Sequence, residues 1–256
     1  MSEAKNDLTS LYSFLYLLCL YLALEFLPLN DWIANSLYAS LVKLGILAVI
    51  LALSIYEIVH NRIKPSCFKN SLASFTLIPL ILGCLSNFFY GLLFIKEQTI
   101  SFNASLFTMD IFISIFSITI EELLFRFLFL TFLSLKIKES KNKDLLVILF
   151  SSLAFCLMHV INFFGNDPLS VLAQLGYTFV LGLILGVIAY YYETPFLTII
   201  GHFLFNFLNQ VFFSAFYSLT FSTQYLVYSI VFALIMILYT LFLVYLIRRK
   251  KHYASS

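Results

Sequence analysis

The chain has 256 residues, of which 62% are hydrophobic and only 11% are charged, and its mean hydropathy is +0.98. A water-soluble fold needs a much larger polar fraction to cover its surface, so we expect lipid to surround most of this chain. The formal net charge of +2 is too small to indicate nucleic-acid binding. Each charged residue inside a bilayer therefore needs a physical reason.

Apolar runs long enough to cross hydrocarbon as helices recur along the whole chain. Such a helix needs about 20 residues. The sequence predicts eight spans, at roughly Leu11–Leu29, Leu37–Val59, Leu72–Ile95, Met109–Leu135, Leu145–Phe164, Val171–Tyr192, Phe196–Phe216 and Tyr225–Ile247. We therefore predict an all-α, polytopic integral membrane protein with about eight transmembrane helices, forming a single membrane domain over residues 1–256.

The distribution of basic residues favours the same number of spans. With eight spans, 12 of the 15 Lys and Arg residues fall on one side of the membrane, which is the cytoplasmic side by the positive-inside rule. These residues are Lys5, Arg62, Lys64, Lys69, Lys136, Lys138, Lys141, Lys143, Arg248, Arg249, Lys250 and Lys251. The sequence thus predicts a multi-pass protein of the cell membrane with both termini in the cytoplasm.

The fourth predicted span carries three charged residues near its middle: Glu121, Glu122 and Arg126. On an insertion scale, each charged residue at mid-bilayer costs roughly 2.5–3.5 kcal/mol. Glu122 and Arg126 are four residues apart on one helix face, so they can form an ion pair. Glu121 is rotated from Glu122 by about 100°. It therefore requires a partner on another helix, or a hydrated cavity.

Other costly polar residues are expected at a similar depth. His159 lies in the fifth span, and His202 and Asn206 are four residues apart on one face of the seventh. Each residue alone has a structural explanation, such as an ion pair or a hydrogen bond between helices. One unpaired carboxylate, two imidazoles and an amide in the same layer together predict a functional site.

This set of side chains suits the hydrolysis of an amide. A carboxylate beside an imidazole can take a proton from water and direct the nucleophile that results. A second imidazole with an amide offers donors for the oxyanion of a tetrahedral intermediate, each worth roughly 3–4 kcal/mol. The alternative is a zinc ion held by Glu121, His159 and His202. The presence of Asn206, a poor zinc ligand, and the absence of an HExxH motif favour the mechanism without a metal.

Three motifs in this region resemble those of a known family. EELLFR (Glu121–Arg126), FCLMH (Phe155–His159) and HFLFN (His202–Asn206) are similar to the EExxxR, FxxxH and HxxxN motifs of the CAAX protease and bacteriocin-processing family, also called CPBP or Abi. Their order and approximate spacing match as well. The resemblance covers roughly Met109–Phe213, which we expect to form a four-helix catalytic core region. One departure is Pro195, where relatives often have a Gly-containing turn.

The resemblance implies an intramembrane endopeptidase acting on a membrane-associated peptide or protein. Glu121 and His159 would activate water, His202 and Asn206 would form the oxyanion site, and the Glu122–Arg126 pair would support the geometry. The family has been described both as metalloproteases and as glutamate-type proteases, so zinc remains an alternative to the favoured cofactor-free mechanism. Short loops fit a bacterial member, and bacterial relatives are linked to bacteriocin self-immunity and peptide maturation.

Two other function classes are compatible with the same residues. A non-catalytic immunity or peptide-binding protein could use the same membrane cavity. A proton-coupled carrier also uses buried Glu and His, but carriers more often show inverted repeats and broken helices, which the sequence does not indicate.

Overall fold

The computed structural model describes residues 2–29, 33, 36–61, 63, 73–93, 95–99, 102–140, 142–192, 195–208, 217–219 and 223–254. Within these residues a helix lies in each of the eight predicted ranges. The helices are α1 (Ser2–Glu25), α3 (Ser36–His60), α4 (Ala73–Leu93), α5 (Ala104–Glu122), α6 (Leu130–Lys136), α7 (Lys143–Met158), α8 (Pro168–Tyr192), α9 (Pro195–Asn206) and α11 (Thr223–Ala254), with a π-helical stretch η1 (Leu123–Phe129) and a 3₁₀ stretch η2 (His159–Phe164).

The described residues confirm the predicted all-helical class, and a short β-ribbon is added to the helices. Strand β1 (Ile95–Thr99) pairs antiparallel with strand β2 (Tyr217–Leu219), so that two connections far apart in the sequence lie side by side. Pairing satisfies backbone N–H and C=O groups that a connection between helices otherwise leaves without partners. Segments this short carry too little periodicity to indicate a strand, which is why the sequence did not predict the ribbon.

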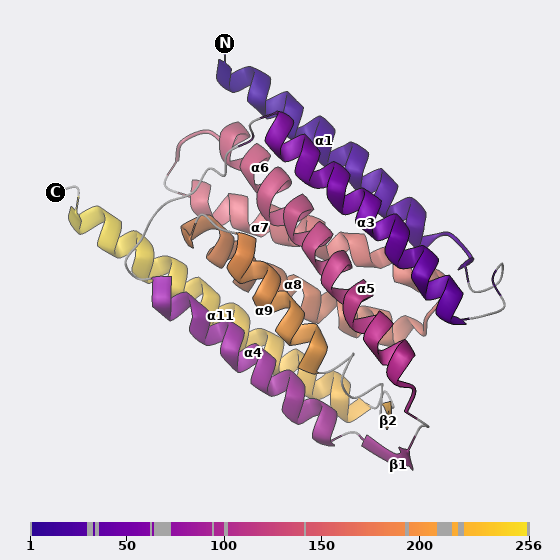
Figure 1. Cartoon of the computed structure of the whole chain (residues 1–256). Coiled ribbons are helices and arrows are strands. Elements are labelled where there is room, and N and C mark those ends of the chain that lie inside the picture. The colour runs from indigo at the N-terminus through magenta and orange to yellow at the C-terminus, as the bar shows by residue number, and fades with distance from the viewer. Residues whose placement is uncertain are drawn as a thin grey trace.

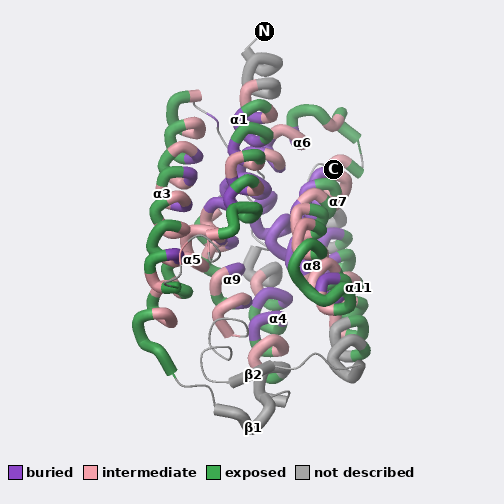
Figure 2. Tube along the Cα trace, turned by 90° about the vertical axis from the view of Figure 1, so that its right-hand side faces the viewer, coloured by how far each residue is buried: buried purple, intermediate pink, exposed green. Residues whose placement is uncertain are grey.

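The helices pack along one another in a single bundle (Figure 1). Helices α1 and α3 lie side by side at one edge, and α4 and α11 lie side by side at the opposite edge, with the other helices between them. The start of α1 and the end of α11 lie toward one end of the bundle, and the β-ribbon lies at the other end (Figures 1 and 2).

The outer surface of the bundle is that of a membrane protein. Three helical stretches in the described part of the chain are long and apolar enough to cross a bilayer: Ser36–His60, Lys143–Phe164 and Pro168–Tyr191. Large apolar side chains are exposed on the outer helices, and Val59 and Leu238 are 69% and 67% exposed. Figure 2 marks much of α3 as exposed. A surface of this kind is stable in lipid but would promote association in water.

Two glycines of α8 allow it to pack closely against α7. A Cβ at Gly182 would lie 3.2 Å from the Cα of Ser152, and one at Gly186 would lie 3.2 Å from the Cγ2 of Ile148. Both distances are shorter than ordinary van der Waals contact, so a larger side chain would push the helices apart. Together with α4, α9 and α11, helix α7 buries every residue of the segment 180–191 of α8.

Candidate active site

The predicted fourth span is not one continuous α-helix. Helix α5 ends at Glu122, and η1 follows in π-helical geometry before α6 begins at Leu130. At the end of η1 the backbone N–H of Leu130 donates to the carbonyl of Phe125, five residues earlier. Turns of this kind are rare and frequently occur at functional sites. Here the change of winding directly follows the two carboxylates of the EExxxR motif.

Glu122 is fully buried and pairs with two cationic or protonatable groups. Its Oε2 lies 3.6 Å from the Nε of Arg126, and both side chains are 0% exposed. The ion pair predicted from the spacing within the span is therefore present. The Oε1 of Glu122 lies 2.9 Å from the Nδ1 of His202 on α9. Because a carboxylate can only accept, the proton of this hydrogen bond belongs to Nδ1, and the ring presents Nε2 on its other side.

Arg126 is held by three different kinds of contact. Its Nη1 donates to the Oγ of Ser151 over 3.3 Å, and its guanidinium carbon lies 4.7 Å from the centre of the Phe155 ring. Its Nε and Nη2 form no hydrogen bond within the described residues, so its attraction to Glu122 is that of charges rather than of a direct hydrogen bond. The positive charge of Arg126 therefore balances a buried carboxylate that would otherwise be very costly.

Glu121 has partners on two other helices, as its orientation in the sequence required. Its Oε1 accepts a hydrogen bond of 2.7 Å from the hydroxyl of Tyr21 on α1. Its Oε2 lies 3.9 Å from the Nε2 of His202, which is too long for a hydrogen bond. The structure thus brings Glu121, Glu122 and His202 together, and His202 lies between the two carboxylates.

Tyr21 contacts Glu121 but was not predicted from the sequence as a site residue. It lies in an apolar helix and outside all three motifs, so it resembles the many other tyrosines of the chain. No pattern in the sequence indicates which tyrosine faces a carboxylate 100 residues later, because that depends on how α1 packs against α5 and η1.

His159 lies beside this group without a direct hydrogen bond to it. It begins η2, where the α-helical winding of α7 ends, and its Nδ1 lies 3.0 Å from the carbonyl of Phe155. The carbonyl can only accept, so Nδ1 carries the proton and Nε2 is left available. The Phe155 ring touches both imidazoles edge-on, with centroid distances of 5.1 Å to His159 and 5.6 Å to His202.

Asn206 is the predicted site residue that makes no contact with the others. It is half-buried at the end of α9, one turn beyond His202, and its side chain forms no hydrogen bond within the described part of the chain. Helix α9 itself is anchored against α4, because the Nδ2 of Asn87 donates to the carbonyl of Phe205 over 2.7 Å. A Cβ at Gly201 would lie 2.3 Å from a methyl group of Leu80, so α9 approaches α4 closely beside His202.

A catalytic zinc ion requires about three protein ligands that converge on one point. Glutamate and histidine suit zinc chemically, but among the described residues no three His, Cys, Asp or Glu side chains converge as ligands. One oxygen of Glu121 already accepts from Tyr21, and one nitrogen of His202 already binds Glu122. Each group still has its other oxygen or nitrogen to offer a metal, so the zinc alternative considered from the sequence stays a hypothesis.

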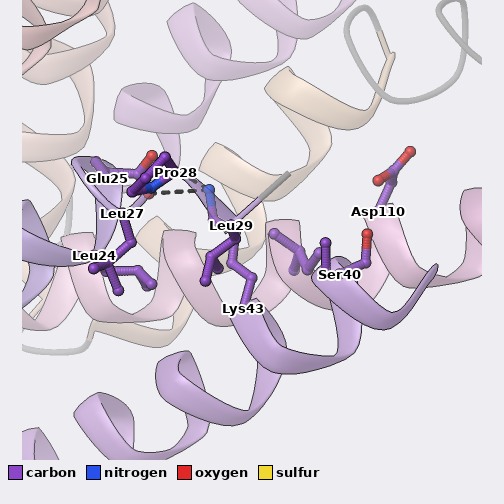
Figure 3. A pocket seen from close by; sticks show the side chains of 10 residues that line it. Leu24, Glu25, Leu27, Pro28, Leu29, Ser40, Lys43 and Asp110 are labelled. Carbon is purple, nitrogen blue, oxygen red and sulfur yellow. Dashed lines mark hydrogen bonds and ion pairs between the residues drawn. The ribbon is translucent and has the colours of Figure 1, made fainter. Parts of the chain in front are cut away.

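A polar cavity of about 460 Å³ opens between α1, α3 and α5 (Figure 3). Its charged residues are Glu25 and Lys43, which form an ion pair of 3.2 Å, and Asp110. Leu24 in its wall lies one turn beyond Tyr21 on α1, and Ile113 lies eight residues before Glu121, about 12 Å along α5. The cavity therefore approaches the buried carboxylates from the end of the bundle that carries the β-ribbon.

Fold and site together define a helical membrane protein with a buried cluster of carboxylates and imidazoles. Residues 102–208 match the model of a protein family, described as Rce1-like, type II CAAX prenyl endopeptidase. The match covers all three motifs but not Tyr21. This segment is thus similar to an Rce1-like domain, which is consistent with a CPBP family protease, and the likeness points to a peptidase of the membrane. Comparisons with curated proteins and with solved structures gave no match.

Proposed function

We propose that this protein is an intramembrane endopeptidase that hydrolyses a peptide bond of a membrane-associated peptide or protein. The observation that carries the proposal is the buried Glu121 carboxylate, whose Oε2 faces the Nε2 of His202 across 3.9 Å within the Rce1-like segment. The Oε2 of Glu121 and the Nε2 of His202 do not hydrogen-bond to each other. They can therefore bind a water molecule and a substrate carbonyl that lie beside them.

Glu121 acts as the general base in this mechanism. Its Oε2 takes a proton from water, and the hydroxide equivalent attacks the carbonyl carbon of the scissile peptide bond. The Nε2 of His159 helps to orient the same water. When the tetrahedral intermediate collapses, the C–N bond breaks and Glu121 returns the proton to the leaving amine.

His202 stabilises the negative charge that develops on the carbonyl oxygen. Its Nδ1–H is held by Glu122, and in its protonated form the ring has an Nε2–H to donate to this oxygen. Loss of one such donor typically costs about 3–4 kcal/mol in the transition state. Asn206 is a second donor in this scheme, with a smaller effect because it stands one turn away. Arg126 keeps Glu122 ionised and in place.

The topology belongs to the same proposal. We infer eight membrane spans with both termini in the cytoplasm of a bacterium, supported by the one-sided distribution of basic residues and by helices in all eight predicted ranges. On this topology the catalytic cluster lies inside the bilayer, where a substrate must enter from the lipid or through a polar opening.

The proposal is tested with purified protein in lipid nanodiscs and a quenched fluorescent peptide that ends in a prenylated Cys-aliphatic-aliphatic-X sequence, beside the same peptide without the prenyl group. Mass spectrometry of membrane peptides, with and without the protein, provides further substrates. We expect Glu121→Gln and His202→Ala to reduce cleavage at least 100-fold. Glu139→Gln is the matched control, because Glu139 is 86% exposed and pairs with Lys143 at the surface. Normal cleavage by a folded Glu121→Gln protein would refute the proposal.

The biological role that fits this activity is peptide maturation or bacteriocin self-immunity. The competing hypothesis is a non-catalytic immunity protein that binds a peptide in the same place. Cells expressing the wild-type chain or Glu121→Gln, challenged with a peptide toxin, separate the two. Protection that is lost with Glu121→Gln supports hydrolysis, whereas protection that persists without any cleavage supports binding.

A further inference from the structure

The hydrogen bond between Tyr21 and Glu121 joins the proposed site to a helix outside the matched segment. Tyr21 is 5% exposed and lies in the apolar cluster formed by α1, α3, α5 and η1. Its hydroxyl donates to the Oε1 of Glu121 over 2.7 Å. A buried hydroxyl paired with a carboxylate is among the stronger hydrogen bonds of a protein, so the contact restricts both side chains.

The contact determines which part of Glu121 is available. The last torsion of a glutamate side chain is soft, and without a partner the carboxylate can turn about it. With Oε1 held by Tyr21, the other oxygen, Oε2, points to His202 but stays 3.9 Å from its Nε2. The hydroxyl therefore keeps the carboxylate from closing into a direct ion pair with His202, which would consume the base.

We propose that Tyr21 is a positioning residue for the reaction, which holds Glu121 so that Oε2 is free to take a proton from water. This inference rests on the proposed function, and it assigns a part of the site to α1. Orientation of a reacting group within a fraction of an ångström is a large contribution to catalysis, so a single buried hydroxyl can matter for the rate. Tyr21 touches Glu121 and acts through it.

A second hydrogen bond of α1 offers a matched control. The Oγ of Ser13 donates to the Oε2 of Glu57 on α3 over 2.7 Å. Ser13 and Tyr21 are eight residues apart and both are 5% exposed. Each links α1 to a carboxylate on a neighbouring helix, but Glu57 is not part of the proposed site. If the Tyr21 hydroxyl only fastens α1 to the bundle, loss of either hydroxyl will have similar consequences.

The test compares Tyr21→Phe and Ser13→Ala with the wild type, using the prenylated fluorescent peptide in nanodiscs. We expect Tyr21→Phe to lower kcat about tenfold, as for the loss of a hydrogen bond to a charged group, with KM within about twofold. We expect Ser13→Ala to leave kcat within about twofold, and both variants to have similar thermal midpoints. The inference would be overturned if Tyr21→Phe had the same kcat as the wild type, or if Ser13→Ala lowered kcat as much as Tyr21→Phe.

A double-variant comparison keeps the inference testable if Tyr21→Phe proves less stable than intended. Glu121→Asp shortens the side chain and withdraws the carboxylate from the hydroxyl. If Tyr21 acts through Glu121, adding Tyr21→Phe to Glu121→Asp lowers kcat less than about twofold. A full tenfold loss in that background would show that Tyr21 acts elsewhere.

The two proposals fail in different ways. A cleaving Glu121→Gln protein, or a wild type that cleaves neither peptide, removes the proposed function and the role of Tyr21 with it. An inactive Glu121→Gln protein beside a fully active Tyr21→Phe protein removes only the role of Tyr21.

Discussion

The segment around η1 and the second half of α8 are equally buried but are stabilised by opposite means. From Ile120 to Leu128 every residue is buried, and this stretch contains two carboxylates and a guanidinium. The segment 180–191 of α8 is also buried throughout, but contains only apolar residues, glycines and tyrosines. Burial in α8 is achieved by apolar packing against α7, α4, α9 and α11, whereas the buried stretch around η1 also requires the pairing of charges.

This difference separates structural packing from the proposed chemistry. Replacing a buried ion pair by apolar residues often stabilises a protein, so stability alone does not explain why charges are placed in the least accessible part of the bundle. Tight apolar packing in α8 provides a rigid support. The buried charges between Ile120 and Leu128 lower stability, but they fix the arrangement of a base, an imidazole and their partners that the proposed hydrolysis requires.

The largest effect on stability is expected from removing one partner of the buried pair. Arg126→Leu removes the guanidinium charge beside Glu122 and leaves the buried carboxylate with its hydrogen bond from His202. Removing one partner of a buried ion pair costs about 3–5 kcal/mol. Thermal or denaturant unfolding in detergent measures the effect. Lys143→Leu is the control, because Lys143 pairs with the exposed Glu139 and its loss should cost at most about 1 kcal/mol. Equal effects of the two substitutions would mean that the Glu122–Arg126 pair is not needed for folding.

The next largest effect is a loss of kcat that differs between the two polar residues of the HxxxN motif. We expect His202→Ala to reduce kcat at least 100-fold and Asn206→Ala about tenfold, because His202 lies between both carboxylates and Asn206 contacts neither. Kinetics on the fluorescent peptide measure both. A larger loss for Asn206→Ala would instead make the amide the principal oxyanion donor.

A smaller effect tests the packing of α8. Gly182→Ala places a methyl group 3.2 Å from the Cα of Ser152, so we expect a loss of about 1–3 kcal/mol in unfolding free energy. Gly176→Ala in the same helix meets nothing within 4 Å and should be neutral or stabilising by up to about 1 kcal/mol. Thermal unfolding of both variants gives the comparison. A tolerated Gly182→Ala would indicate that α7 and α8 can separate without cost.

The smallest effect is expected from chelators. Under the proposed mechanism, treatment of active protein with a strong zinc chelator leaves the cleavage rate unchanged, because Glu121 and His202 act directly on water and substrate. Elemental analysis of the same samples accompanies the assay. Stoichiometric zinc together with chelator-sensitive cleavage would replace this mechanism by the zinc-dependent alternative.

Much of this molecule follows from local features of the sequence. Long apolar runs predict helices wherever they occur, because an apolar segment in lipid must satisfy its backbone hydrogen bonds internally. The ion pair of Glu122 and Arg126 was predictable, since residues four apart meet on one helix. That Glu121 needs a partner elsewhere followed from its orientation relative to Glu122.

Only the tertiary structure decided which partners these residues have. The contacts of Glu121 with Tyr21 and of Glu122 with His202 join residues that are 100 and 80 positions apart. The pairing of β1 with β2 likewise joins segments that are distant in the chain. Sequence spacing defines neighbours along one helix, but the rotation and depth of each helix in a bundle are set by the packing of all its neighbours together. For that reason Glu121 could be predicted as a site residue from the sequence, whereas the Tyr21 hydroxyl that holds it could not.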